Sequence, residues 1–138
     1  KPALEPKLIK KDEKGRILIV QIKLQGENIY LVGVYAPNDN KSEFYKKLET
    51  DLMEFADQKI IIMGDLNGVT SLEIDRTITK KETKEGKLPK TFFDMGQSLN
   101  LVDIWRVRHL MEKQFTYYSH VHERSVRIDA VWITKELE

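Results

Sequence analysis

The segment IIIMGDLNG, residues 60–68, joins a run of apolar residues to two polar side chains. A short continuous apolar run is typical of a strand in the middle of a sheet, and we expect this one to be covered on both faces. Asp65 and Asn67 follow at alternate positions, and side chains two apart on an extended chain point the same way. Central strands of α/β sheets deliver their last residues to the rim where ligands bind. The segment therefore predicts a carboxylate and an amide together at that rim.

The same two residues also have a simpler interpretation. Asp and Asn often begin a loop with an Asx turn, in which the side chain bonds to the backbone two residues on. At a rim, however, a carboxylate can bind a metal ion or take a proton from water, and an amide can hold an oxyanion. The pair alone does not decide between a turn and a catalytic site.

The flanking sequence predicts one α/β unit with strands in the majority. Runs of β-branched and aromatic residues predict further strands at 16–24, 28–38, 115–119 and 126–134, the last two joined by HVHERS. Apolar residues recur every three to four positions over 41–57, where Asn40 and Glu43 suggest a capping box, and again after Pro89. We expect 101–105 to be a short strand or turn, and the lysine-rich stretch 75–90 to be a mobile loop.

Composition narrows the class of protein only slightly. The chain has 138 residues, 41% hydrophobic and 33% charged, which suits one soluble domain. It contains no cysteine, so disulfides and thiolate metal sites are excluded, as is usual for an intracellular protein. No apolar run approaches the roughly 20 residues that span a bilayer, so we expect no membrane partner. The net charge of +1 is too small to predict nucleic-acid binding by itself.

Two further residues are candidates for chemistry. Tyr35 ends the second strand just as Asp65 ends the central one, although tyrosine is also common at strand ends. Asp129 lies inside the apolar run VRIDAVWIT, where an acid is costly unless it is paired or hydrogen-bonded. A structural ion pair with Arg106 or Arg127 is the alternative to a catalytic role.

The segment 106–127 concentrates basic residues around the predicted hairpin. HVHERS is expected to form an exposed basic tip, and a solvated turn is the simplest interpretation of it. The two histidines of HVH, His120 and His122, alternate on one strand face, but no third ligand for a metal accompanies them.

Taken in order, VYAPN, IIIMGDLN, DIWR and FTYYS followed by RID resemble the exonuclease–endonuclease–phosphatase superfamily. The likeness is greatest to the endonuclease domain of LINE-type (non-LTR) retrotransposons. It implies an α/β fold built as a two-sheet β-sandwich flanked by helices, with four layers in the order α/β/β/α. It also implies hydrolysis of a DNA phosphodiester with Mg²⁺, or Mn²⁺ in its place.

The resemblance assigns roles to four residues of the catalytic rim. Asp65, a candidate metal ligand as well, would orient and deprotonate the attacking water, and Asn67 would help to hold the phosphate. Tyr35 would contact the scissile phosphate. Asp129 would pair with a catalytic histidine and fix its tautomer, as the acid of a triad does.

The resemblance also implies a DNA-facing surface and particular partners. The DNA-facing residues would be Arg76, Thr116, Ser119, His122 and Arg124, reading duplex shape more than bases. Double-stranded DNA would be the substrate, a reverse transcriptase domain the neighbour in a parent polyprotein, and the nucleus the place of action.

Parts of the family pattern do not appear in the sequence. We find neither the strands that carry an asparagine and a metal-binding glutamate nor the Ser-Asp-His motif, so residues 1–138 are expected to be a partial domain, incomplete at both ends. Such a chain should hydrolyse DNA weakly or not at all, and its exposed sheet edges should favour dimers. The alternatives are a DNA-binding or scaffold module without chemistry, and another phosphoesterase of the superfamily.

Overall fold

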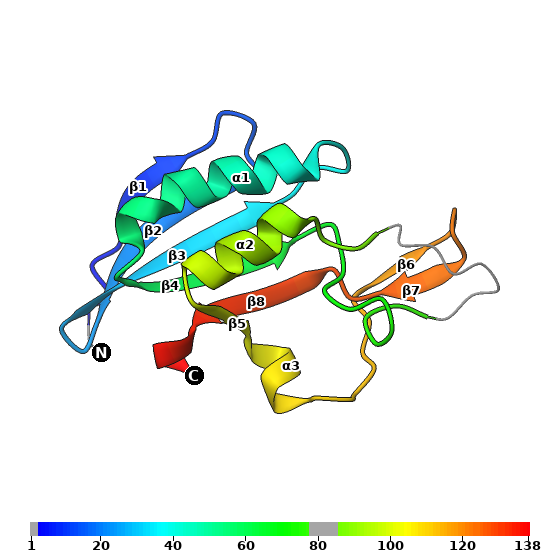
Figure 1. Cartoon of the computed structure of the whole chain (residues 1–138). Helices are drawn as coiled ribbons and strands as arrows, with labels where there is room; N and C mark the ends of the chain where they lie inside the picture. The colour runs from blue at the N-terminus through cyan, green and yellow to red at the C-terminus, as the bar shows by residue number, and fades with distance from the viewer. Residues whose placement is uncertain (1–2, 78–85) are drawn as a thin grey trace.

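The computed structural model describes residues 3–77 and 86–138, which fold around a six-stranded sheet with strand order β1-β2-β3-β4-β8-β5 (Figure 1). Its strands are β1 Lys7–Lys11, β2 Ile17–Leu24, β3 Glu27–Tyr35, β4 Lys59–Asp65, β5 Leu101–Asp103 and β8 Asp129–Thr134. A separate two-stranded sheet pairs β6 Tyr117–Ser119 with β7 Arg124–Val126. The helices are α1 Lys41–Leu52, α2 Lys90–Ser98 and α3 Ile104–Arg108, with short 3₁₀ turns η1 Met53–Phe55 and η2 Lys135–Leu137. The predicted mixed α/β fold with two sheets and flanking helices is confirmed.

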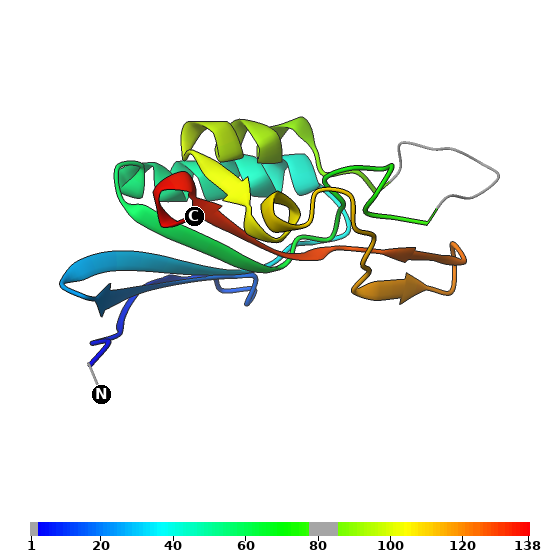
Figure 2. The ribbon, with the colours of Figure 1, turned by 90° about the horizontal axis from the view of Figure 1, so that it is seen from below.

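β4 occupies an inner position in the large sheet, as its apolar sequence predicts. It runs parallel to β3, the two being connected through α1, and antiparallel to β8. Helices α1 and α2 lie side by side on one face of the sheet (Figure 2). Ile60 and Ile62 belong to the buried core, together with Leu48 and Leu52 of α1 and Met95 of α2. Periodic apolar residues in the sequence thus correspond to the helix faces that cover the sheet.

The opposite face of the sheet remains apolar and exposed in the described chain. Leu18, Gly33, Met63 and Val131 lie in register across β2, β3, β4 and β8, and Met63 is 36% exposed. The expectation that β4 is covered on both faces is therefore wrong for this chain. The two edge strands of the sheet are short: β1 is bulged and lysine-rich, and β5 has only three residues.

Three local predictions need correction. The run 126–134 is not one strand of a hairpin, since the chain leaves β7 at Val126 and joins the large sheet at Asp129. Asn40 precedes α1 with φ 58° and makes no side-chain cap, because capping requires an extended backbone at that position. The loop predicted at 75–90 starts with buried residues, Asp75 and Arg76, and its central part, 78–85, lies outside the described residues.

No helix in the described part of the chain is both long and apolar enough to cross a bilayer.

Candidate active site and nucleic-acid groove

Three of the predicted catalytic side chains lie in one row across the sheet. Tyr35 of β3 is paired in register with Asp65 of β4, and Asp65 with Asp129 of β8. Register partners project from the same face, and this row continues the exposed row of Met63 and Val131, so it faces away from the helices. Tyr35 is 60% exposed, and Asp129 is exposed as well. The fold thus brings together residues that lie as far apart in the sequence as positions 35 and 129.

Asp65 forms the Asx turn that was the simpler interpretation, and it still belongs to the row. Its Oδ1 accepts the backbone N–H of Asn67 at 2.8 Å. Burial is the main cause that raises the pKa of the Asp65 carboxyl above its ordinary value. The hydrogen bond from the Asn67 N–H and the positive charge of Lys41 lower this pKa, whereas the negative charge of Asp129 raises it further. A carboxylate with a raised pKa is a better proton acceptor, so the turn and the catalytic interpretation are compatible.

Asn67 does not point with Asp65 as the extended pattern predicts. Its φ of 51° is left-handed, which turns the side chain toward the loop after β3. There its Nδ2 donates to the Ala36 carbonyl oxygen at 3.2 Å and to Oδ1 of Asn38 at 2.7 Å. Both N–H groups of the amide are therefore in use, and holding a phosphate oxygen would require release of one. Asn38, from VYAPN, is a site residue that sequence reasoning missed.

Gly64 and the buried Tyr45 fix the end of β4. Gly64 has φ 134°, and a Cβ at this position would lie 2.1 Å from the Val34 carbonyl oxygen, so only glycine allows β4 to lie against β3 here. The buried Tyr45 of α1 donates its hydroxyl to the Leu66 carbonyl oxygen at 2.6 Å. The Leu66 N–H in turn donates to the Ile128 carbonyl oxygen at 2.9 Å. Tyr45 was also missed, because its place on the apolar side of a helix suggests only packing.

The expected structural partners of Asp129 pair elsewhere. Arg127 and Arg106 bond to Asp75, and among the described residues Asp129 forms no ion pair. Its backbone is held instead by Thr116, whose hydroxyl oxygen accepts the N–H groups of Ile128 at 3.1 Å and Asp129 at 3.2 Å. An exposed, unpaired carboxylate at a rim favours the functional interpretation over the structural one.

A hollow of about 590 Å³ opens beside Asp129. Trp105, His109, Phe115 and Thr116 also line it. His109 stacks on Trp105 with ring centroids 4.7 Å apart, and its Nδ1 lies 2.9 Å from the Glu112 carboxylate. Of the described histidines, this is the one that shares a hollow with Asp129.

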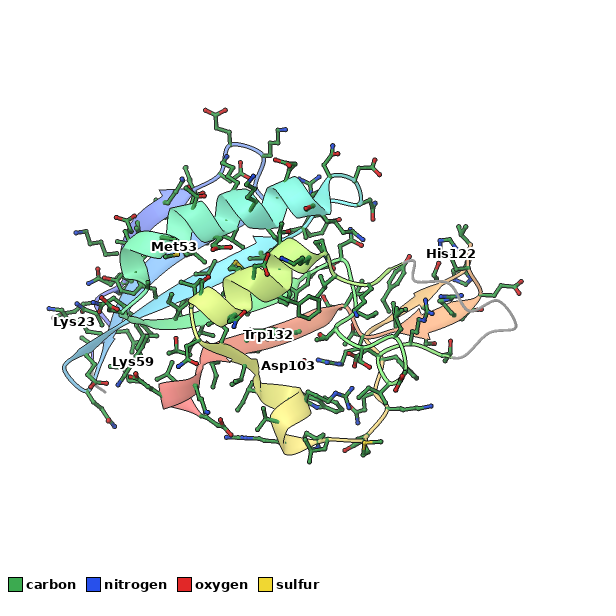
Figure 3. All side chains as sticks on the ribbon, viewed as in Figure 1. Lys23, Met53, Lys59, Asp103, His122 and Trp132 are labelled. Carbon is green, nitrogen blue, oxygen red and sulfur yellow. The ribbon has the colours of Figure 1, made fainter. Side chains whose placement is uncertain are left out.

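A second hollow, of about 470 Å³, is the candidate nucleic-acid groove, and it brings together four of the five predicted DNA-facing residues. They are Arg76, Ser119, His122 and Arg124. Asn38, Lys41, Asn67 and Tyr117 line the same groove, so the phosphate-holding candidate and the basic residues share one surface. The two-stranded sheet extends away from the large sheet and carries His122 toward its tip (Figure 3). Thr116 is not in the groove; it lines the hollow beside Asp129.

The donor chemistry at the row suits a hard divalent cation. Mg²⁺ in proteins is commonly held by one or two carboxylates together with substrate phosphates. Asp65 and Asp129 supply two carboxylates in register, and their mutual repulsion contributes to the raised pKa of Asp65. Within the described ranges no cluster of three His, Cys, Asp or Glu side chains is placed to hold a metal. The pair therefore fits an ion whose remaining ligands come from water and the substrate.

Comparison with solved structures finds this fold in several nucleases. An AP endonuclease from Archaeoglobus fulgidus superposes with a TM-score of 0.68 at 17% identity, over 99% of this chain and 60% of its own. The AP endonuclease LMAP from Leishmania major gives 0.70 at 18% identity, over 98% and 54%. The endonuclease domain of TRAS1, a telomere-specific non-LTR retrotransposon, gives 0.60 at 18% identity, over 96% and 55%.

Comparison of sequences finds a transposon protein. The "Transposon TX1 uncharacterized 149 kDa protein" of Xenopus laevis is 27% identical over 128 residues, which are 89% of this chain and 10% of that protein. No protein-family model matches the chain. The chain thus spans a tenth of its curated relative and 54% to 60% of the solved structures. The resemblance drawn from the motifs is confirmed in these terms: the structural neighbours of this chain are AP endonucleases and a non-LTR retrotransposon endonuclease domain, and the sequence match is a transposon protein.

Proposed function

We propose that this chain is part of a DNA endonuclease of a LINE-type retrotransposon, which nicks double-stranded DNA by hydrolysis of a phosphodiester. One observation supports this most strongly. The register row Tyr35, Asp65 and Asp129 stands next to a groove lined by Asn67 and by arginines from two separate segments. A carboxylate row beside a basic groove suits attack on the backbone of a polyanion.

In this proposal the row performs the chemistry. Asp65 orients a water molecule and takes its proton as the water oxygen attacks phosphorus. The P–O ester bond breaks, and the leaving sugar oxygen takes up a proton from solvent to depart as a hydroxyl. Tyr35 contacts the scissile phosphate through its exposed side chain. Asn67 holds a phosphate oxygen after releasing Asn38 or Ala36. Asp129 pairs with a catalytic histidine, either His109 from the adjoining hollow or one from outside this chain.

Mg²⁺, or Mn²⁺ in its place, is the proposed cofactor. Asp65 is the candidate ligand from this chain, and the ion would supply stabilisation of the negative charge that develops on the phosphate. We expect hydrolysis by this chain alone to be weak or absent, because the family's metal-binding glutamate and Ser-Asp-His motif do not appear in its sequence. We also propose a reverse transcriptase as the neighbour in a parent polyprotein, and the nucleus as the place of action.

Nicking of supercoiled plasmid tests the proposed chemistry. The wild-type chain is incubated with Mg²⁺ and with EDTA, and Asp65→Ala is incubated with Mg²⁺. Asp94→Ala is the matched control, because Asp94 lies on α2 and pairs with the exposed Lys90. Magnesium-dependent nicking that is lost in Asp65→Ala and retained in Asp94→Ala would support catalysis by the row. Nicking that survives in Asp65→Ala would contradict it.

Duplex binding tests the groove independently of hydrolysis. We expect the affinity for duplex DNA to fall steeply as the salt concentration rises. Arg124→Ala should make the slope of log K against log salt less negative by about 0.9 for each phosphate that Arg124 neutralises. Salt-dependent binding without nicking would favour the DNA-binding or scaffold alternative. Absence of binding by the folded chain at low salt would refute the proposed DNA substrate.

A further inference from the structure

Four charged side chains form a compact, largely buried network behind the groove. Asp75 is 0% exposed, Arg127 5% and Asp103 6%, with Arg106 at their edge. Arg127 donates from Nε to Asp75 at 2.8 Å and from its terminal nitrogen to Asp103 at 2.6 Å. Arg106 donates to the same Asp75 oxygen at 2.5 Å. Two acids and two arginines thus balance their charges just below the surface, and Arg127 also lines the hollow beside Asp129.

The network joins three segments that are far apart in the sequence. Asp75 immediately precedes Arg76 of the groove, and Arg127 lies two residues before Asp129 of the row. Asp103 ends β5 beside β8 and caps α3 through the Arg106 N–H at 3.2 Å (Figure 3). Each segment therefore carries, or directly precedes, a residue of the proposed site or of its hollow.

Backbone hydrogen bonds run alongside the charged side chains. The Arg127 N–H donates to the Asp75 carbonyl oxygen at 2.7 Å, and the Thr77 N–H donates to the Ser125 carbonyl oxygen at 2.9 Å. Arg76 forms a β-bridge with Val126. We call this junction of 75–77 with 125–127 the joint. It fixes how the loop of Arg76 lies relative to the chain that enters β8.

The chemistry of the joint requires arginine at position 127. Its planar guanidinium has donors in a fixed fork, so it can bond two carboxylates from different segments at once, whereas a lysine ammonium is a flexible point charge. The guanidinium carbon also lies 5.2 Å from the centre of the Trp105 ring, which lines the hollow of Asp129. Buried ion pairs are poor stabilisers compared with apolar packing, so their value here lies in geometry.

We propose that Arg127 is a positioning residue that sets the groove arginine Arg76 and the row acid Asp129 in their relative places. The inference rests on the proposed function in so far as the positioned groove binds DNA. Arg127 itself points into the network and touches no substrate in this scheme.

The test compares Arg127→Lys and Arg127→Met with wild type, and uses Lys47→Met on the exposed side of α1 as the matched control. Hydrogen exchange of backbone amides is measured at positions 77 and 127 in the joint and in β3 and β4. We expect protection at the joint to fall by about tenfold or more in both Arg127 variants while β3 and β4 stay protected. Equal loss at the joint and in the sheet, or no loss at all, would overturn the inference, because Arg127 would then be only a stabiliser or dispensable.

Duplex binding by the same variants provides the second readout, at a temperature at which all of them are folded. We expect Arg127→Lys to weaken binding by about tenfold with an unchanged salt slope, since the variant neutralises as many phosphates as the wild type. A reduced slope would contradict a positioning role and place Arg127 on the DNA. If the wild-type chain binds no DNA, the proposed function fails, and the exchange measurement still decides the role of Arg127.

Discussion

Removal of a single hydroxyl in Tyr45→Phe should destabilise the loop that carries the candidate catalytic residues. Tyr45 is 0% exposed and Leu66, whose carbonyl it bonds at 2.6 Å, is 1% exposed. The Phe ring keeps the edge contact of Tyr45 with Phe92, at 5.0 Å between centroids, so packing changes little. Burial, with the Asp65 carboxylate adding to it, raises the pKa of the Tyr45 phenol, so the hydroxyl remains a donor at any ordinary pH.

The magnitude follows from what the substitution leaves behind. A buried carbonyl without its donor costs about 1–3 kcal/mol of unfolding free energy, which for a domain of this size lowers Tm by roughly 3–15 °C. Urea denaturation followed by circular dichroism measures the change. Tyr30→Phe is the matched control, because Tyr30 stacks on Phe55 and its hydroxyl has no hydrogen-bond partner among the described residues. A loss below about 0.5 kcal/mol in Tyr45→Phe, or an equal loss in both variants, would refute the reasoning.

Further predictions concern the end of β4, acid stability and the exposed face. Gly64→Ala should prevent normal folding, because its Cβ would lie 2.1 Å from the Val34 oxygen; a native thermal transition would contradict this. Burial alone would raise the pKa of Asp75, but bonds from Arg127, the Ser71 N–H and Arg106 hold it below its ordinary value. Its contribution to stability is therefore complete above about pH 4 and is lost as the pH falls through the folded pKa, so Asp75→Asn should flatten the acid decline of Tm. Self-association, measured by light scattering, should decrease in Met63→Lys if the exposed apolar face is responsible, and an unchanged profile would exclude that face.

Local sequence determined the elements of this protein and much of its candidate site. The apolar runs at 17–24, 27–35 and 59–65 form strands because β-branched residues suit a pleated, half-buried surface. Tyr35, Asp65 and Asp129 were identified as polar residues at the ends of apolar segments or within them. The alternation of strand side chains is a local property, so it can be read without knowing the fold.

Tertiary structure decided which of these residues meet and how they are held. The register of β3, β4 and β8 sets Tyr35, Asp65 and Asp129 in one row, and register depends on pairing across long stretches of chain. The left-handed turn at Asn67 and the bond from Tyr45 to the Leu66 carbonyl could not be predicted, because each depends on a partner supplied by another segment. The arginines that flank Asp129 in sequence or space pair instead with Asp75 and Asp103, since burial selects the partner that satisfies the most donors. Sequence thus specified the chemical groups, and long-range packing specified their geometry.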